Sequence, residues 1–273
     1  AQARRMATSA TSTVCRMIRL SYCLEPSRNA MSRPVALVTG GGQGIGAATC
    51  LRLAKDGYDI LLTYNTSSKP AEMLVDKIRE QYGDALAVKV DCANEGEVSL
   101  LSIHPWMAKK IDVLVLNHGA YNRIAASELT IETLRETMMI NFEGSVAVWK
   151  AIQPHLSERA RMVVVGSQLG TRGSPHGADY SASKAALAVW ARSLAQQVGP
   201  EGKRVNILAP GYVDTAILAG DSQQKRAQRE NEVPLKRVGT PEDMAATISF
   251  LVSDDSAYIT GSIIHVNGGL YLP

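Results

Sequence analysis

Tyr180 and Lys184, four residues apart, are the side chains of this sequence best suited to acid–base chemistry. At that spacing two side chains share one face of a helix, about one turn apart. An ammonium group beside a phenol favours the phenolate, and so lowers the pKa of the phenol from about 10 toward neutrality. Tyr180 is therefore a candidate general acid or base. Because such a pair is more often a solvated couple on a protein surface, the hypothesis depends on neighbouring groups.

A serine upstream of this pair supplies one neighbouring group. Ser167 follows the apolar run Met162–Val165, which predicts a buried strand, so the serine stands at the strand's carboxyl end. Its hydroxyl can donate a hydrogen bond to a carbonyl oxygen on which charge develops. Gly166-Ser167-Gln168 lacks the Gly-x-Ser-x-Gly pattern of a hydrolase. The alternative is an ordinary serine in a turn.

A glycine-rich loop, Thr39-Gly40-Gly41-Gly42-Gln43-Gly44-Ile45-Gly46, follows the first apolar run and opens a helical segment. Glycines let the backbone turn and approach a pyrophosphate closely, while the helix start offers free N–H groups. The strand–loop–helix order predicts a dinucleotide site, with a plain tight turn as the alternative. The candidate contacts in this loop are Gly40, Gln43, Gly44, Ile45 and Gly46.

The choice of dinucleotide depends on the end of the second strand. NAD-binding proteins usually place Asp or Glu there to hold the ribose hydroxyls. Here the expected strand Asp59–Tyr64 is followed by Asn65-Thr66-Ser67-Ser68-Lys69. Small donors and a lysine suit a 2′-phosphate, so Asn65, Thr66 and Ser67 favour NADP. An ordinary polar turn is the alternative. Gln43 counts against NADP, because related proteins often carry an arginine there.

The elements that must position these residues alternate between short apolar runs and amphipathic segments, which predicts a parallel sheet covered on both faces. Right-handed crossovers then give one α/β, doubly wound (Rossmann) domain with a mostly parallel sheet of about seven strands. The expected strands are Pro34–Thr39, Asp59–Tyr64, Ala85–Val90, Ile111–Leu116, Met162–Val165, Arg204–Leu208 and Ser262–Val266, and the expected helices are Ala47–Asp56, Ala71–Tyr82, Asn94–Met107, Thr130–Ile152, Ala178–Val198 and Pro241–Leu251.

The segment Pro210–Val238 is the least regular part of this domain. It follows the carboxyl end of a strand, where ligands bind in such folds, and it is long for a connector. We expect either a lid over the substrate or a solvated surface helix.

Charge divides the 273-residue chain into two parts. Residues 1–33 hold six arginines and one acid, so the net charge of +3 for the whole chain leaves the body net negative. A negative body does not favour nucleic acid as a partner. The Arg- and Ser-rich residues 1–32 are predicted to be an extension ahead of a domain at 33–273, either an organelle transit peptide or a non-native leader. The expected location is the cytoplasm, or a mitochondrion or plastid if residues 1–30 are a transit peptide.

The distribution of histidines, cysteines and apolar residues argues against a metal-binding, a disulfide-rich or a membrane-spanning protein. The five histidines are scattered, and the four cysteines show no zinc-ligand spacing. No apolar stretch reaches the roughly 18 residues that cross a bilayer. We therefore expect no metal site, no disulfide framework and no membrane partner.

Together these motifs resemble the short-chain dehydrogenase/reductase family from about Arg33 to the C-terminus. Thr39–Gly46, Asn117-His118-Gly119-Ala120, Asn141, Ser167, Tyr180-x-x-x-Lys184 and Pro210-Gly211 with Thr215 carry the resemblance. It implies that Tyr180 donates a proton, Ser167 orients the substrate carbonyl, Lys184 holds the nicotinamide ribose and Asn141 anchors a proton-relaying water. It further implies cofactor contacts from Asp91, Asn117, Gly119, Pro210, Gly211, Val213 and Thr215.

Two departures from the family pattern bear on these expectations. The order Asn-His-Gly-Ala replaces the Asn-Asn-Ala-Gly or Asn-His-Ala-Gly that is usual in the family, a swap that could shift the loop but should not abolish cofactor binding. The C-terminal part, from Pro234 to Gly269, is most similar to 3-oxoacyl-[acyl-carrier-protein] reductases. Those proteins place arginines on two long helices where an acidic carrier docks, and here the matching positions are Pro154 and Gln196. Arg123, Arg172 and Arg192 are candidate substitutes.

The resemblance therefore implies NADPH-dependent reduction of a 3-oxoacyl thioester in fatty acid biosynthesis, with an acyl carrier protein as a candidate partner. The spacing of Tyr180 and Lys184 argues against an enoyl reductase. One alternative is an NADP(H)-dependent reductase of a free ketone, sugar or aromatic polyol, and another is a catalytically silent NADP-binding protein. A homotetramer formed through the two long helices and the last strand is expected, although core packing explains the same apolar spacing.

Overall fold

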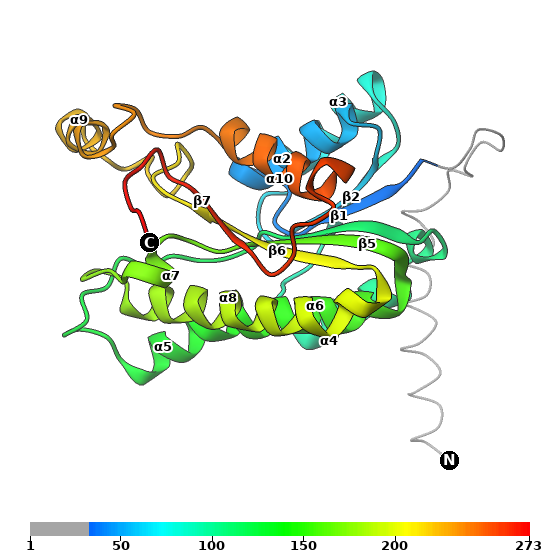
Figure 1. Ribbon diagram of the computed structural model, residues 1–273, viewed down its shortest axis with the longest axis horizontal. Coiled ribbons are helices and arrows are strands. Elements are labelled where there is room, and N and C mark those ends of the chain that lie inside the picture. The colour runs from blue at the N-terminus through cyan, green and yellow to red at the C-terminus, as the bar shows by residue number, and fades with distance from the viewer. Residues whose placement is uncertain (1–32) are drawn as a thin grey trace, which may run out of the picture. The chain divides into compact units, whose positions relative to one another are not determined.

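The computed structural model describes residues 33–273, and the predicted extension at 1–32 lies outside the described residues. Seven parallel strands form one sheet in the order β3-β2-β1-β4-β5-β6-β7 (Figure 1). The predicted doubly wound α/β sheet is therefore confirmed. The strands are β1 (Val35–Val38), β2 (Asp59–Tyr64), β3 (Ala85–Lys89), β4 (Ile111–Leu116), β5 (Leu156–Val165), β6 (Arg204–Pro210) and β7 (Ile263–Val266).

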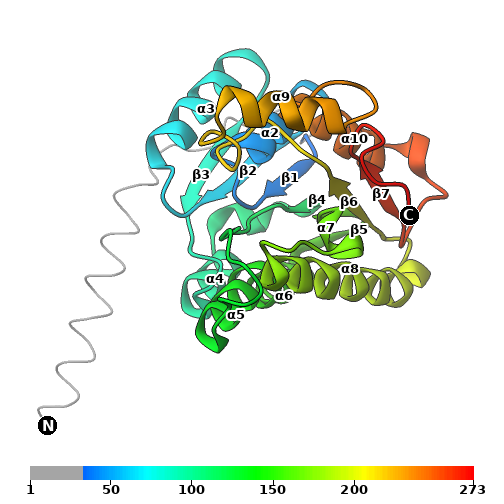
Figure 2. The same cartoon turned by 90° about the vertical axis from the view of Figure 1, so that its left-hand side faces the viewer.

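Helices cover both faces of the sheet, which explains why its central strands are apolar throughout (Figures 1 and 2). One layer holds α2 (Gly44–Lys55), α3 (Ser68–Gln81) and α10 (Pro241–Val252), and the opposite layer holds α4 (Glu95–Ser102), α5 (Ile131–Met138), α6 (Gly144–Ile152) and α8 (Ala178–Val198). Each layer packs its own core against the sheet: Leu53, Ile78 and Ile248 belong to the first, and Val148 and Leu187 to the second. Two further helices, α7 (Leu169–Arg172) and α9 (Gln223–Glu232), lie toward the viewer in Figure 2.

Local sequence signals account for several helix boundaries. Thr130 and Thr240 each open a helix through a capping box, in which the threonine side chain and the side chain three residues on bond each other's backbone N–H. Pro241 then occupies the first turn of α10, where its missing N–H costs nothing. Pro105 divides the expected helix Asn94–Met107 into α4 and a 3₁₀ turn at Pro105–Ala108, because proline disfavours helical backbone before it.

Two further elements differ from the sequence prediction. The single helix expected over Thr130–Ile152 contains a π turn at Met139–Glu143, which separates α5 from α6. The strand expected at Met162–Val165 begins at Leu156 instead, because its first half is polar and partly exposed and so lacks an apolar run.

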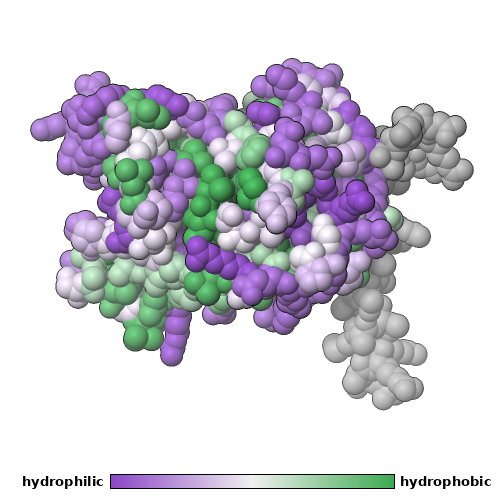
Figure 3. Space-filling model, in the orientation of Figure 1, coloured by the Kyte–Doolittle hydropathy of each residue, from purple (hydrophilic) through white to green (hydrophobic). Residues whose placement is uncertain are grey.

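The outer strand β7 leaves one edge of the sheet unpaired in the described structure. All four of its residues are only partly buried, and Figure 3 shows apolar residues gathered over this edge between the two helical layers. Within residues 33–273 no helix is both long and apolar enough to cross a membrane.

Candidate active site

One large cavity, of about 1260 Å³, opens where the strands end at their carboxyl side. Parallel strands bring these ends to one edge of the sheet, which is where open α/β sheets bind ligands. Of the predicted site residues, only Gly46 and Asn141 do not line the cavity. Those that line it are Gly40, Gln43, Gly44, Ile45, Asn65, Thr66, Ser67, Asp91, Asn117, Gly119, Ser167, Tyr180, Lys184, Pro210, Gly211, Val213 and Thr215.

The glycine loop forms a cradle at the start of α2 that side chains would fill. Gly40 and Gly44 adopt φ angles of 62° and 52°, in the left-handed region that favours glycine. A Cβ on Gly42 would lie 2.5 Å from Ser67 Oγ, and a Cβ on Gly46 would lie 2.2 Å from Gly40 O. No side chain caps the start of α2, so its first N–H groups are available to an anion. The loop therefore fits a dinucleotide pyrophosphate.

Asn117 fastens this loop to the end of β4. Its side-chain nitrogen donates to Thr39 O at 3.0 Å and to Gly40 O at 3.1 Å, and its backbone N–H donates to Thr39 Oγ1. The amide of Asn117 is thus occupied by the loop, so this residue shapes the cavity wall. Gly119 leaves room beside it, because a Cβ there would lie 3.0 Å from Asn141 Oδ1 and 3.3 Å from Lys184 Nζ.

The end of β2 presents small polar groups to the cavity. Asn65, Thr66 and Ser67 line it, whereas Asp59 lies at the opposite end of β2 and pairs with Lys109 at 3.3 Å. Lys69, expected beside a phosphate, stands in the first turn of α3 outside the cavity lining. The donor set at this end consists of the neutral side chains, which still suit a 2′-phosphate better than ribose hydroxyls held by a carboxylate.

Tyr180 and Lys184 lie on the cavity-facing side of α8, with Lys184 Nζ 5.7 Å from the centre of the Tyr180 ring. Burial raises the pKa of Tyr180 to about 12, against the opposing effect of a hydrogen bond with Ser167. The expected fall of this pKa toward neutrality is wrong for the described structure, because burial outweighs the lowering effects and no hydrogen bond joins Lys184 to the phenol. The ammonium instead donates to Val165 O at 2.9 Å, and burial lowers the pKa of Lys184 itself to about 8.

Ser167 stands beyond the end of β5, as the apolar run predicted. Its hydroxyl accepts a hydrogen bond from Leu169 N at 3.1 Å, and it also bonds to Tyr180. Backbone hydrogen bonds fix the residues on either side of Ser167 to β6: Gly166 N donates to Leu208 O, and Gln168 N donates to Pro210 O. Ser167 and Tyr180 therefore face the same part of the cavity.

Asn141 lies in the π turn and is fully buried. Its side chain accepts from Ala120 N at 2.8 Å and donates to Ala120 O and Ser183 Oγ, both at 3.0 Å. The residue thus fastens the loop after β4 to α8, one residue from Lys184. π turns recur at functional sites, and this one carries a residue that the resemblance assigns to catalysis.

Two residues around this site were not predicted. His118 accepts or donates a hydrogen bond with Thr39 Oγ1 at 2.8 Å, and its other ring nitrogen lies 3.4 Å from Ser145 Oγ. Burial, aided by the charge of Lys184, lowers the pKa of His118 to about 3, so the ring is neutral. Tyr121 packs its ring 4.6 Å from that of Tyr180. The only signal in the sequence is that His118 belongs to the Asn117–Ala120 motif and Tyr121 directly follows it.

Part of the segment Pro210–Val238 lines the cavity, as expected for a lid, and its helix α9 buries no residue, as expected for a solvated surface helix. Arg123, from the loop after β4, holds this segment by donating to Ile217 O at 2.7 Å and to Asp221 Oδ1 at 3.1 Å. Arg229, on α9, bonds the other oxygen of Asp221 at 2.5 Å. The lid side chains that face the cavity are Tyr212, Thr215, Ala216, Ile217, Leu218, Lys225 and Arg229.

The three arginines considered for carrier docking fall in different places. Arg123 and Arg172 line the main cavity, whereas Arg192 lines a separate hollow of about 290 Å³ together with Gln196. Pro154 lies in an exposed 3₁₀ turn after α6. Within residues 33–273, no group of three or more His, Cys, Asp and Glu side chains is placed to hold a metal ion.

Comparison with known proteins agrees with this geometry. The family model described as "Enoyl-(Acyl carrier protein) reductase" matches residues 40–271. An uncharacterized oxidoreductase of Methylorubrum extorquens is 35% identical, covering 86% of this chain and 97% of its own. A 3-oxoacyl-[acyl-carrier-protein] reductase of Staphylococcus aureus is 32% identical over 87% and 98%, and a cyclohexanol dehydrogenase of Rhodococcus is 36% identical over 86% and 95%.

Solved structures give the same result. A short-chain dehydrogenase from Burkholderia cenocepacia, in complex with NADP, aligns with a TM-score of 0.82 at 35% identity, covering 89% of this chain and 99% of that one. A dehydrogenase/reductase from Sinorhizobium meliloti aligns with a TM-score of 0.83 at 31% identity, over 89% and 97%. With the sheet order, the glycine cradle and the Tyr180–Lys184 pair, these matches identify the chain as an oxidoreductase of the short-chain dehydrogenase/reductase family.

Proposed function

We propose that this oxidoreductase uses NADPH to reduce the ketone of a 3-oxoacyl thioester to the 3-hydroxyacyl product. The observation that carries the proposal is the meeting of Ser167, Tyr180 and Lys184 in the cavity that also contains the glycine cradle. The reductases named for 3-oxoacyl-[acyl-carrier-protein], at 32% identity in Staphylococcus aureus and 34% in Synechocystis, support the choice of substrate.

The residues around the cavity suit NADPH, which would supply a hydride to the substrate carbonyl. The glycine cradle and the start of α2 would hold the pyrophosphate, and Asn65, Thr66 and Ser67 the 2′-phosphate. The NADP complex of the Burkholderia relative supports this choice. The remaining contacts would come from Asp91 at the adenine, Lys184 at the nicotinamide ribose and the backbone of Pro210, Gly211 and Val213 at the nicotinamide. Further contacts along the cofactor would come from Asn117, Gly119 and Thr215.

The protein's own chemistry is proton donation and charge stabilisation. Ser167 would donate a hydrogen bond to the substrate carbonyl and so orient it toward Tyr180. Because burial holds the pKa of Tyr180 near 12, its phenol keeps its proton at neutral pH and can give it to the alkoxide oxygen as that charge forms. The Tyr180 O–H bond breaks, a hydroxyl forms on the product, and the nearby Lys184 ammonium stabilises the phenolate. Asn141 would anchor the water that returns a proton.

A free ketone is the second candidate substrate. The cyclohexanol dehydrogenase relative, 36% identical, favours it. An enoyl thioester is less suited, because Tyr180 and Lys184 are four residues apart.

NADPH oxidation with acetoacetyl-CoA tests the proposal, with cyclohexanone and crotonyl-CoA as competing substrates. We expect fast turnover of acetoacetyl-CoA and a loss of about 10²- to 10⁴-fold in kcat for Tyr180→Phe. NADPH binding, measured by fluorescence, should survive this substitution. A preference for cyclohexanone by orders of magnitude in kcat/KM would reject the thioester. Binding of NADPH without turnover of any carbonyl compound would identify a silent NADP-binding protein.

A homotetramer completes the proposal. The exposed Val189 on α8 and the partly exposed edge strand β7 support association through these elements. Sedimentation at micromolar concentration should give a tetramer, and a monomer would contradict it.

An acyl carrier protein as partner and a role in fatty acid biosynthesis follow from the proposed substrate. A fusion of residues 1–30 to a fluorescent protein tests the transit peptide, which predicts an organelle instead of the cytoplasm.

A further inference from the structure

Besides Lys184, four cationic side chains line the cavity: Arg123, Arg172, Lys225 and Arg229. The first three are exposed to solvent as well, so they lie where the cavity opens. They come from separate segments, because Arg123 is in the loop after β4, Arg172 ends α7 and Lys225 is on α9. In Figures 1 and 2, α7 lies beside α8, whereas α9 lies on the other side of the sheet, the side that carries α2 and α10.

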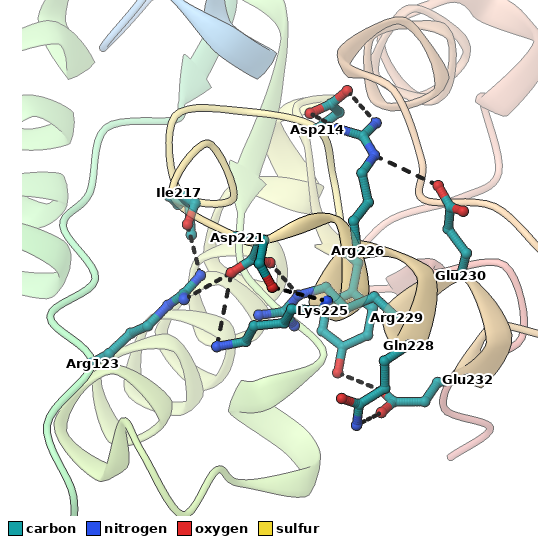
Figure 4. A network of polar contacts seen from close by, with 12 residues as sticks. Arg123, Asp214, Ile217, Asp221, Lys225, Arg226, Gln228, Arg229, Glu230 and Glu232 are labelled. Atoms are coloured by element: carbon teal, nitrogen blue, oxygen red, sulfur yellow. Dashed lines mark hydrogen bonds and ion pairs between the residues drawn. The ribbon is translucent and has the colours of Figure 1, made fainter.

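One carboxylate, Asp221, is shared among three of these cations. Its side chain is only 4% exposed and lies 2.5 Å from Arg229 Nε, 3.1 Å from Arg123 Nη1 and 3.8 Å from Lys225 Nζ (Figure 4). The pKa of Asp221 lies below its ordinary value, mainly because of its bond to Arg229, so it carries a full negative charge. One negative charge among three positive ones leaves an excess of two. Asp221 therefore holds the lid and orients Arg123 and Arg229, but does not neutralise the cluster.

Arg172 adds a further positive charge. Among residues 33–273 it makes no ion pair or hydrogen bond through its guanidinium, although its charge reaches Tyr212 on the lid and acts to lower that residue's pKa. The carboxylates that line the cavity are Asp91, which follows β3, and Glu136 on α5. Near Arg172 and Lys225 the opening of the cavity therefore carries more positive charge than the neighbouring carboxylates neutralise.

We propose that Arg172 and Lys225 bind a phosphate group on the pantetheine arm of the thioester substrate. The proposal rests on the proposed function, because the acyl part of such a substrate is neutral and its negative charge lies on the phosphate of the arm, away from the reacting carbonyl. Arg123 and Arg229 add positive potential from the lid side and are kept in place by Asp221. Charge-assisted bonds from arginine and lysine are the usual means of binding phosphate.

A pair of thioesters that differ by one phosphate tests the proposal: acetoacetyl-pantetheine and acetoacetyl-4′-phosphopantetheine. We expect the wild-type protein to prefer the phosphorylated compound by about 10- to 100-fold in kcat/KM, as charge-assisted hydrogen bonds imply. Arg172→Gln and Lys225→Gln should each bring this ratio close to one, through a higher KM for the phosphorylated compound. Arg172→Lys should restore most of the preference.

Arg226→Gln is the matched control. Arg226 neighbours Lys225 on α9, but it pairs with Asp214 at 2.7 Å and does not line the cavity. The substitution Arg226→Gln removes one positive charge from α9, as Lys225→Gln does, but outside the cavity, so the preference for the phosphorylated thioester should be kept. Equal kcat/KM on the two thioesters in the wild-type protein, or loss of preference in Arg226→Gln alone, would overturn the phosphate site while leaving thioester reduction intact. Failure to reduce either thioester, with turnover of cyclohexanone, would overturn the proposed function and this site with it.

The phosphate can belong to coenzyme A or to a carrier protein. Comparing acetoacetyl-CoA with a carrier-bound acetoacetyl thioester at fixed ionic strength distinguishes the two sources. In either case the site requires that Arg172→Gln and Lys225→Gln weaken the preferred substrate. If neither substitution weakened turnover of the preferred substrate, the site would be overturned.

Discussion

The ammonium nitrogen of Lys184 lies 5.7 Å from the centre of the Tyr180 ring and donates its hydrogen bond to Val165 O. The lysine is thus near the phenol without bonding it, and burial dominates the ionisation of both groups. The pKa of Tyr180 rises to about 12 and that of Lys184 falls to about 8. Near neutral pH the pair holds a proton to donate and a positive charge to stabilise the phenolate, which is the combination that ketone reduction needs.

Because the pKa of Lys184 is lowered to about 8, ketone reduction should slow as the pH rises through 8. The ammonium is present below that value and is lost above it, whereas Tyr180 keeps its proton up to about pH 12. The measurement is kcat/KM for acetoacetyl-CoA between pH 6 and pH 10. Lys184→Gln should be slower and show no fall near pH 8, and Lys184→Arg should keep its charge throughout. A fall at the same pH in Lys184→Gln would assign it to another group.

His118 should make the fold sensitive to acid. Its pKa is lowered to about 3 in the folded protein, against about 6.5 in the unfolded chain. Below pH 6.5 the unfolded state therefore binds a proton that the folded state excludes, so stability is present above that pH and is lost as the pH falls toward 3. At pH 4.5 the loss from this residue is about 2 to 3 kcal/mol.

Urea unfolding of the wild-type protein and His118→Asn at pH 7.0 and pH 4.5 measures this effect. Acidic groups common to both proteins cancel in the comparison. The wild-type protein should lose more free energy of unfolding between the two pH values than the variant does. Equal losses would mean that His118 does not titrate with folding.

Gly46→Ala should destabilise the protein and impair its binding of NADPH. The added Cβ would lie 2.2 Å from Gly40 O, a backbone atom that cannot move without shifting the glycine loop. Forcing a methyl group into a packed site costs about 1 to 3 kcal/mol. Thermal unfolding and fluorescence titration with NADPH provide the measurements. Gly199→Ala is the control, because no atom lies within 4 Å of its added Cβ. Equal behaviour of the two variants would show that the loop tolerates displacement.

The parts of the site predictable from sequence are those whose geometry is local or follows from strand order. Tyr180 and Lys184 share a helix face by spacing alone, and Ser167 reaches them because parallel strands end at one edge. The π turn around Asn141 was not predicted, since the helical period of its residues continues through it. The raised pKa of Tyr180 depends on burial, and the sharing of Asp221 among Arg123, Lys225 and Arg229 depends on tertiary contacts. Neither is visible in residue spacing.

Asn65→Asp should shift cofactor preference from NADPH toward NADH. Asn65 follows the end of β2 and lines the cavity, so a carboxylate there would repel a 2′-phosphate and accept hydrogen bonds from ribose hydroxyls. We expect KM for NADPH to rise about tenfold or more, as for the loss of one charge-assisted contact, and KM for NADH to fall. Lys69→Gln changes the net charge equally but lies outside the cavity lining, so it should keep the NADPH preference. If Lys69→Gln weakened NADPH binding and Asn65→Asp did not, the phosphate would be held by α3 instead of by the residues that follow β2.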